Sequence, residues 1–281
     1  MDSGAEVSVL IASAERSSSS THAAQLAEAA LAHARRIVVF SGAGICAESG
    51  INTFRDPEVG VWKNKIALAL FAVPFGWRWM PTMAWWGYKK FHTPIAAAQP
   101  NEGHRTVARL RDELHLADAD AVQVITQNVD ALHQRAGSPT EFVYEVHGSV
   151  WRHRCIKNGH PMDLLVEGKL PEAQPRCAIC GSPARPDVVL FTESLPEDAW
   201  LKSEVAVCGL RAGDVLLVVG TSGVVQPGAS LPELCAPGVV KIEVNIEHTA
   251  HSKGMNVCIR QSSSIALPLL LQLAKEGRDP T

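Results

Sequence analysis

The sequence has little net charge. Its 26 Lys and Arg residues nearly balance 29 Asp and Glu residues, which leaves a formal charge of −3, and only 20% of the chain is charged. Such a chain exerts no broad electrostatic attraction on nucleic acid, so we expect no direct nucleic-acid partner. Because 46% of the residues are hydrophobic, the chain also lacks the composition of a disordered protein. Its 281 residues suffice for one large α/β domain with a smaller unit attached.

Long uninterrupted apolar runs and targeting signals are also missing. The most hydrophobic stretch, 66–87, is broken by Pro74, Arg78 and Pro81, which argues against a membrane-spanning helix. The first ten residues carry acidic side chains and no basic one, unlike a secretory leader. The seven cysteines are an odd number scattered along the chain, which is typical of reduced thiols. We therefore expect a cytoplasmic protein with no membrane partner.

Short, largely apolar runs recur along the chain, as expected of buried parallel strands. They cover 37–40, 122–126, 142–146, 188–191, 215–219 and 239–244, and helical patterns cover 102–114, 197–210 and 265–275. This alternation predicts an α/β fold with a doubly wound, parallel, Rossmann-like sheet.

Two stretches interrupt the alternation, and they predict smaller inserted modules. Residues 57–100 are rich in Trp, Phe and Pro, which favours a helical, aromatic-rich insertion. Residues 151–186 hold cysteines and little periodicity, which favours a small zinc-ribbon-like insertion. We assign 1–20 to a flexible leader, and the Rossmann-like domain to 21–56, 101–150 and 187–281.

The first apolar run ends in a glycine loop. Gly42-x-Gly44-x-x-Ala47 fits the dinucleotide-binding pattern, in which glycines allow backbone N–H groups to approach a pyrophosphate. Alone this pattern is weak, since glycine turns between strands and helices are common. A dehydrogenase should also carry an acidic residue about 20 residues further on, whereas Asp56 comes too early. A hydride-transfer enzyme is therefore disfavoured.

Three more polar segments follow apolar runs, where open α/β sheets bind ligands. They are 126–137, 145–148 with His147, and 220–222. A histidine at a strand end is often structural, and Thr-Ser after a strand is an ordinary cap. Their joint occurrence in this order, behind the glycine loop, is not explained by chance.

Together these segments resemble the signature of the sirtuin family. The matching stretches are 42–51 with Phe54 and Arg55, the TQN-containing segment 126–137, His147-Gly148, 185–193, 220–222 and 244–245. The resemblance extends over about residues 22–272. It implies an NAD-dependent protein lysine deacylase, which transfers the acyl group of an acyl-lysine protein to ADP-ribose and releases nicotinamide.

The resemblance also implies roles for single residues. His147 is the expected catalytic base, because the unperturbed pKa of histidine lies near neutrality, and Asn128 positions the ribose or a water. Expected NAD contacts are Gly42, Ala43, Gly44, Ser49, Ile51, Phe54, Arg55, Gln127, Asn128, Asp130, Gly220, Thr221, Ser222 and Asn245. Within this set, Ile51 and Asp130 hold the nicotinamide carboxamide and Phe54 shields the reactive carbon.

The expected substrate contacts are Tyr88, Val189 and Phe191, with the peptide paired as a strand after Val189. Sirtuins that remove acidic acyl groups carry Tyr-x-x-Arg in the helical insertion. Here Tyr88 matches the tyrosine and Phe91 takes the arginine position, so we predict neutral acyl groups to be favoured over succinyl and malonyl. A single gap in the alignment would instead bring Lys90 to that position.

Three departures from the family pattern are Cys46 for Ser, Asn52 for Pro and Thr192 for Gly. None removes a group that the chemistry needs, although Thr192 adds a branched side chain where the peptide is expected.

The family's small module holds a structural zinc with two Cys-x-x-Cys pairs. Cys177 and Cys180 form one pair, but after Cys155 the fourth position is Asn158. His160 can complete a shell of three cysteines and one histidine, which is a common zinc shell. The alternative is a decayed site without metal.

Two other functions remain open from the sequence. One is a mono-ADP-ribosyltransferase or NAD hydrolase, and the other is a non-catalytic NAD-binding sensor. Whether NAD consumption requires an acylated peptide separates them from the deacylase.

Overall fold

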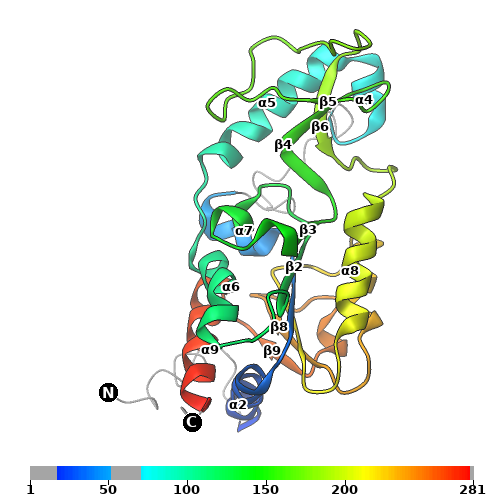
Figure 1. The fold of residues 1–281 in the computed structure, drawn as a ribbon. Helices are drawn as coiled ribbons and strands as arrows, with labels where there is room; N and C mark the ends of the chain where they lie inside the picture. The colour runs from blue at the N-terminus through cyan, green and yellow to red at the C-terminus, as the bar shows by residue number, and fades with distance from the viewer. Residues whose placement is uncertain (1–17, 52–70, 279–281) are drawn as a thin grey trace.

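A computed structural model describes residues 18–51 and 71–278. The chain folds into a large α/β unit, and a small sheet and two helices lie together at one end of the molecule (Figure 1). None of the described helices is long and apolar enough to cross a membrane. Phe54 and Arg55, expected to contact NAD, lie outside the described residues, as does Asn52.

The large sheet is parallel throughout, as predicted. Its six strands run in the order β3-β2-β1-β7-β8-β9. Their bounds are β1 Ile37–Ser41, β2 Val122–Thr126, β3 Val143–Glu145, β7 Val215–Val219, β8 Val240–Val244 and β9 Val257–Ile259. Every residue of β1 and β7 is buried, which explains why these strands are apolar without alternation. The short edge strand β9 was not predicted.

Helices cover both faces of this sheet. They are α2 Ser18–His33, α6 Glu102–Glu113, α7 Leu132–Arg135, α8 Glu197–Gly209 and α9 Ser263–Gly277. One apolar cluster joins α2, α6 and α9 to one face, and a second joins α8 to the other. Helix α6 begins where the Asn101 side chain accepts hydrogen bonds from the backbone of Gly103 and His104. Helix α2 begins within the stretch predicted as a leader.

The strand expected at 188–191 was assigned to the wrong sheet. The chain instead forms β6 Ala184–Val188, which pairs antiparallel with β4 Gly148–Cys155. With β5 Pro161–Met162 they form a three-stranded sheet in the order β5-β4-β6. An apolar run does not show its partner, and here the long strand β4 provides the pairing edge.

The aromatic insertion forms helices α4 Pro74–Trp79 and α5 Pro81–Ala97. Trp77, Trp85 and Tyr88 from these helices join Val150 and Ala184 of the small sheet in a third apolar cluster. This packing holds the helical segment against the small sheet, beside the carboxyl ends of β1 and β2.

Candidate active site

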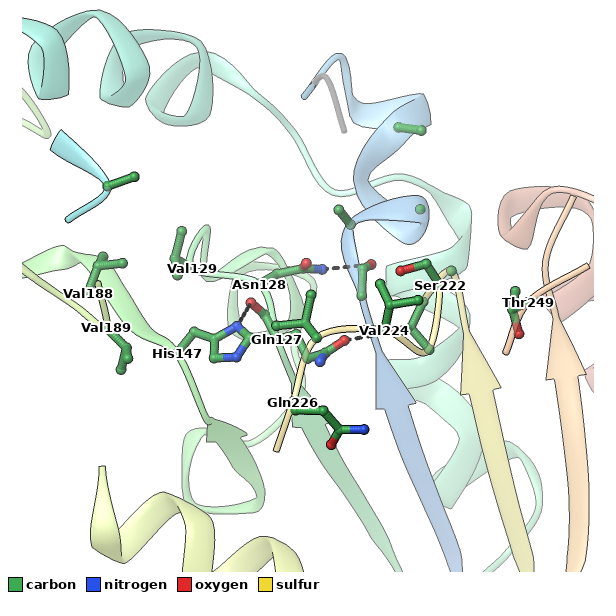
Figure 2. Close-up of a pocket in the computed structure, with 18 of the residues that line it drawn as sticks. Gln127, Asn128, Val129, His147, Val188, Val189, Ser222, Val224, Gln226 and Thr249 are labelled. Atoms are coloured by element: carbon green, nitrogen blue, oxygen red, sulfur yellow. Dashed lines mark hydrogen bonds between the residues drawn. The ribbon is translucent and has the colours of Figure 1, made fainter. Parts of the chain in front are cut away.

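A cavity of about 870 Å³ opens at the carboxyl ends of the parallel strands. In the sheet, β2 and β3 lie on one side of β1, and β7, β8 and β9 lie on the other. The strand order therefore reverses between β1 and β7. Open α/β sheets bind ligands at such a reversal. The loops after β1, β2, β7 and β8 all contribute to the wall (Figure 2).

The glycines of the first loop permit a tight approach of two chain segments. A Cβ on Gly44 would lie 2.7 Å from Gly220 Cα, and a Cβ on Gly42 would lie 2.9 Å from Thr221 Cα. Gly220 has φ +60°, and its own Cβ would lie 2.4 Å from the Ile45 nitrogen. Larger residues would separate the loops after β1 and β7. The 3₁₀ helix η1, Ala43–Ser49, then starts directly at the cavity.

A network of hydrogen bonds joins four of the strand-end loops. The Asn128 amide donates to the carbonyl of Gly42 at 3.0 Å, and the Thr221 hydroxyl donates to Gln127 Oε1 at 2.8 Å. The Asn245 amide donates to the carbonyl of Thr221 at 3.0 Å. These bonds set the side chains of the loops after β1, β2, β7 and β8 relative to one another.

His147 follows β3, and its ring is fixed by a backbone contact. Nδ1 donates to the carbonyl oxygen of Gln127 at 2.9 Å (Figure 2), so Nε2 is the nitrogen able to accept a proton. Burial lowers the pKa of His147 below its ordinary value, and the bond to Gln127 opposes this only partly. The ring is therefore neutral at neutral pH, as a general base must be.

Steric crowding requires glycine at position 148, directly after His147. Gly148 has φ +77°, and a Cβ there would lie 2.1 Å from the carbonyl oxygen of Asp187. Next to it, the backbone of Val189 donates to the carbonyl of His147 at 2.9 Å. The close passage of β4 and β6 thus requires glycine and fixes Val189 beside the histidine.

Cys46 forms a buried bridge beneath the glycine loop. Its thiol donates to Asp130 Oδ2 at 2.9 Å and accepts from the Asn128 amide at 3.1 Å. Burial, followed by the charge of Asp130, raises the pKa of Cys46, so this thiol is not a ready nucleophile. It stands where the family pattern has serine, and it acts as a donor and an acceptor between two polar side chains.

The other end of the cavity is apolar. Tyr88 and Phe91 of α5 line it together with Phe71, Trp77, Val129 and Val150. The Tyr88 hydroxyl donates to the carbonyl of Val150 at 2.8 Å and lies 2.9 Å from His153 Nε2. Its bonding capacity is thus satisfied within the protein.

Both lysines beside Phe91 lie elsewhere. Lys90 Nζ is 3.5 Å from the centre of the Trp86 ring, and Lys89 pairs with Glu172 at 2.7 Å. Among the described residues, the lining of the cavity includes no Lys or Arg. Phe91 therefore lines the cavity, and Lys90 does not.

Residues near the start of α9 and after β8 were missed in the sequence. Ser262 and Ser263 line the cavity, and in the described part of the chain their hydroxyls have no hydrogen-bond partner. The run of serines before an apolar helix is an N-terminal signal that would have pointed to them. Thr249, another lining residue, donates to the buried Glu243, which also pairs with Arg260 at 2.6 Å.

Most of the predicted site residues meet at this cavity. Those that line it are Gly42, Ala43, Gly44, Tyr88, Gln127, Asn128, His147, Val189, Phe191, Gly220, Thr221, Ser222 and Asn245. Three others lie behind the wall. Ser49 accepts from Asn101 at 3.0 Å, Asp130 caps the backbone of Leu132 at 2.9 Å, and Ile51 packs against two apolar clusters.

Thr192 also lines the cavity and has φ +79°, a conformation that a β-branched residue rarely adopts. The backbone here keeps a shape suited to glycine although the side chain is threonine.

The predicted metal ligands come together in the small sheet. One ligand atom from each of Cys155, His160, Cys177 and Cys180 lies within 4.8 Å of the others. The Cys155 and Cys180 sulfurs are 3.7 Å apart, and Cys177 Sγ is 3.5 Å from His160 Nδ1. Tetrahedral zinc with Zn–S bonds of about 2.3 Å places sulfurs about 3.8 Å apart. The four side chains fit such an ion.

Comparison with known proteins identifies the family. The Sir2 family model matches residues 42–227. The chain belongs to the Sir2 family. This Sir2 protein is 44% identical over 241 residues to an NAD-dependent protein deacylase of Mycobacterium tuberculosis, covering 84% of this chain and 97% of the relative. It is an NAD-dependent protein deacylase, as predicted.

Solved structures agree with this Sir2 assignment. A Sir2 homologue in complex with NAD superposes with a TM-score of 0.79 at 32% identity, covering 91% of this chain and 94% of that one. A complex of Sir2 with a p53 peptide and NAD⁺ gives a TM-score of 0.71 at 29% identity, with coverages of 88% and 95%.

Proposed function

We propose that this Sir2 deacylase removes acyl groups from lysine side chains of proteins, with His147 as the general base. The observation that carries the proposal is the Nδ1 bond of His147 to the Gln127 carbonyl, which leaves Nε2 to take a proton inside the cavity. When bound, NAD would supply the ADP-ribose that receives the acyl group, with nicotinamide as the leaving group. His147 Nε2 would accept a proton from a ribose hydroxyl.

Several features of the cavity fit NAD. The glycines at 42 and 44 keep backbone close to the cavity after β1. The hydroxyls of Ser262 and Ser263, which have no hydrogen-bond partner among the described residues, lie at the start of α9. The N-terminus of a helix favours an anion such as a phosphate. We assign the adenosine half to Thr221, Ser222 and Asn245 on the side of β7 and β8.

The nicotinamide half then lies on the side of β2 and β3, where Asn128 and His147 are. Contacts of the carboxamide with Ile51 and Asp130 stay a prediction. Asp130 is bonded to Cys46 and to the backbone of Leu132, so its support for the loop is independent of any ligand.

We assign the acyl-lysine peptide to the part of the cavity near Val189 and Phe191. Phe191 is 41% exposed, and Val224, which also lines the cavity, is 47% exposed. Exposed apolar side chains suit an extended peptide whose sequence matters little. The complex of a homologue with a p53 peptide supports a protein substrate.

We further propose that neutral acyl groups are preferred. Phe71, Trp77, Phe91 and Val150 form the apolar end of the cavity, and no described Lys or Arg lines it. A succinyl carboxylate would lose its hydration there without an ionic partner, whereas a methylene gains about 0.8 kcal/mol on burial. Tyr88 cannot compensate without giving up its bonds to Val150 and His153.

The metal cluster supports a structural zinc held by Cys155, His160, Cys177 and Cys180. Asn158 stands where the family has a fourth cysteine, and His160 supplies the fourth ligand atom instead. The cluster lies at the end of β4, where a metal would hold the loop 155–160 to the loop 177–181.

The principal test is a His147→Ala variant assayed with NAD and acetylated peptide. Loss of a general base lowers turnover by about a hundred- to ten-thousand-fold, whereas the affinity for NAD should change little. His33→Ala, an exposed histidine at the end of α2, is the matched control and should behave as the parent. Near-normal turnover of His147→Ala would refute the assignment.

The same assay without peptide separates the alternative functions. A hydrolase consumes NAD without an acylated peptide, and a sensor consumes none in either case. The position of His147 in a cavity with an apolar end favours the deacylase.

A further inference from the structure

The helical insertion carries an apolar face that points to solvent. Trp77 and Trp85 are 1% exposed, so these two rings pack inward. By contrast, Phe75, Trp79, Met83 and Trp86 are 59%, 65%, 55% and 61% exposed. Phe75 and Trp79 are four residues apart in α4, and Met83 and Trp86 are three apart in α5, so each pair lies on one outer face of its helix.

Basic groups accompany these rings. The Arg78 guanidinium lies 5.7 Å from the centre of the Trp79 ring, and Lys90 Nζ lies 3.5 Å from that of Trp86. Lys89, on the same helix, is paired with Glu172. We call Phe75, Arg78, Trp79, Met83, Trp86 and Lys90 the outer aromatic face. Figure 1 places α4 and α5 at the end of the molecule opposite α2 and α9.

The sequence around this face has charge of one sign. The described part of the insertion, residues 71–101, contains no Asp or Glu but three basic residues, Arg78, Lys89 and Lys90, although the whole chain has a net charge of −3. The same run holds four of the seven tryptophans. Positive charge is therefore concentrated where large rings are exposed.

We infer that the outer aromatic face binds the surface of a membrane that contains anionic lipids. Tryptophan and phenylalanine rings insert at the boundary of headgroups and acyl chains, and lysine and arginine beside them attract anionic headgroups. Such helices lie in the plane of the membrane. This agrees with the finding that no described helix can cross one. The inference revises the expectation from the sequence that the protein has no membrane partner.

A second copy of the chain fits this face less well. In a two-fold symmetric dimer the same surface meets itself, so Arg78 and Lys90 would approach the same basic groups of the other copy. A lipid surface offers negative charge instead. It also adapts to projecting rings, whereas a protein partner needs a complementary acidic groove.

The test is binding of the purified full chain to vesicles of phosphatidylcholine, with and without phosphatidylserine, measured by co-sedimentation. We expect binding to the anionic vesicles only, and release at high salt because screening weakens the attraction. Brominated acyl chains should quench tryptophan fluorescence if the rings insert. Arg78→Gln/Lys90→Gln should weaken binding about 25-fold, since each basic residue near such a surface contributes about fivefold.

Trp79→Gln/Trp86→Gln should reduce binding at least as strongly and remove most of the bromine quenching. The matched control is Leu201→Gln/Val205→Gln, which removes two residues of α8 that are 57% and 64% exposed, and it should bind as the parent does. Activity on a soluble peptide should be unchanged in all variants, which shows that they fold. Equal binding to neutral and anionic vesicles would overturn the inference. So would a loss of vesicle binding in the α8 control as large as that in the tryptophan variant. So would self-association that the tryptophan variant abolishes without any vesicle binding.

Discussion

At the scale of the residue, His147 depends on one hydrogen bond and on its burial. The bond from Nδ1 to Gln127 selects the tautomer, and burial lowers the pKa. A histidine at a strand end could be recognised from the sequence, but its tautomer and its pKa depend on a carbonyl twenty residues away in the chain.

The lowered pKa has a consequence for the pH dependence of catalysis. The base is active when neutral, so kcat/KM should fall on the acidic side with a midpoint below the ordinary histidine value of 6.5. A pH profile of kcat/KM with acetylated peptide measures this. A midpoint above 6.5 would show that another group, or a charged His147, controls the acidic limb.

Phe91 provides a test of acyl selection. Phe91→Arg places a guanidinium at the apolar end of the cavity, three residues from Tyr88, on the same face of α5. We expect the ratio of kcat/KM for succinyl-lysine over acetyl-lysine to rise at least tenfold, because a charge-assisted bond contributes about 1.5–3 kcal/mol. Phe91→Leu is the control and should leave this ratio unchanged. A parent enzyme that already prefers succinyl-lysine would refute the proposal.

At the scale of the element, β4 and β6 show what an apolar run leaves undecided. The run 188–191 is as apolar as a strand of the large sheet, yet Val188 ends β6 and pairs with Gly148 in the small sheet. Strand pairing is a choice between partners distant in sequence, and only the assembled fold makes it. The same pairing places Val189 beside His147.

The small sheet also allows a test of the metal. Protein purified without chelator should contain about one zinc per chain, and His160→Ala should lower both zinc content and Tm, because the metal ties two loops together. His160→Ala/Asn158→Cys should recover both, since it restores a fourth thiolate. Elemental analysis and thermal unfolding measure these effects. Zinc well below one equivalent in the parent protein would indicate a decayed site.

At the scale of the whole molecule, two buried histidines link the stability of the fold to pH. Burial lowers the pKa of His104 to about 2 and that of His133 to about 4. Their rings lie 5.1 Å apart, and His133 Nε2 is 2.9 Å from the Ser41 hydroxyl. They connect α6 and α7 to the end of β1, underneath the glycine loop.

These lowered values predict loss of stability in mild acid. Below pH 6.5 these histidines become protonated in the unfolded chain but stay neutral in the folded protein. The free energy of unfolding therefore decreases as the pH falls. Between pH 6.5 and 5 each ring should lower the free energy of unfolding by about 1.6 kcal/mol. Urea unfolding at the two pH values measures the loss, and His133→Gln should reduce it. If His133→Gln lost as much unfolding free energy as the parent does, His133 would not be a source of the pH dependence.

The sequence by itself determined the parallel sheet, the family, the activity and the residues at the strand ends. These follow from local patterns, because each polar segment directly follows an apolar strand and parallel strands end at one edge. Gly44, Asn128 and His147 met at the cavity for this reason.

Only the tertiary structure decided which side chains of the insertion line the cavity and which are exposed to solvent. Trp77 and Phe91 line the cavity, Lys90 lies over Trp86, and Trp79 is exposed. It also brought His160 to the three cysteines and showed Ser262 and Ser263 at the cavity. These outcomes depend on how α4, α5 and the small sheet pack together. Such contacts join residues far apart in the chain, and an apolar pattern records that a side chain is buried but not which neighbour buries it.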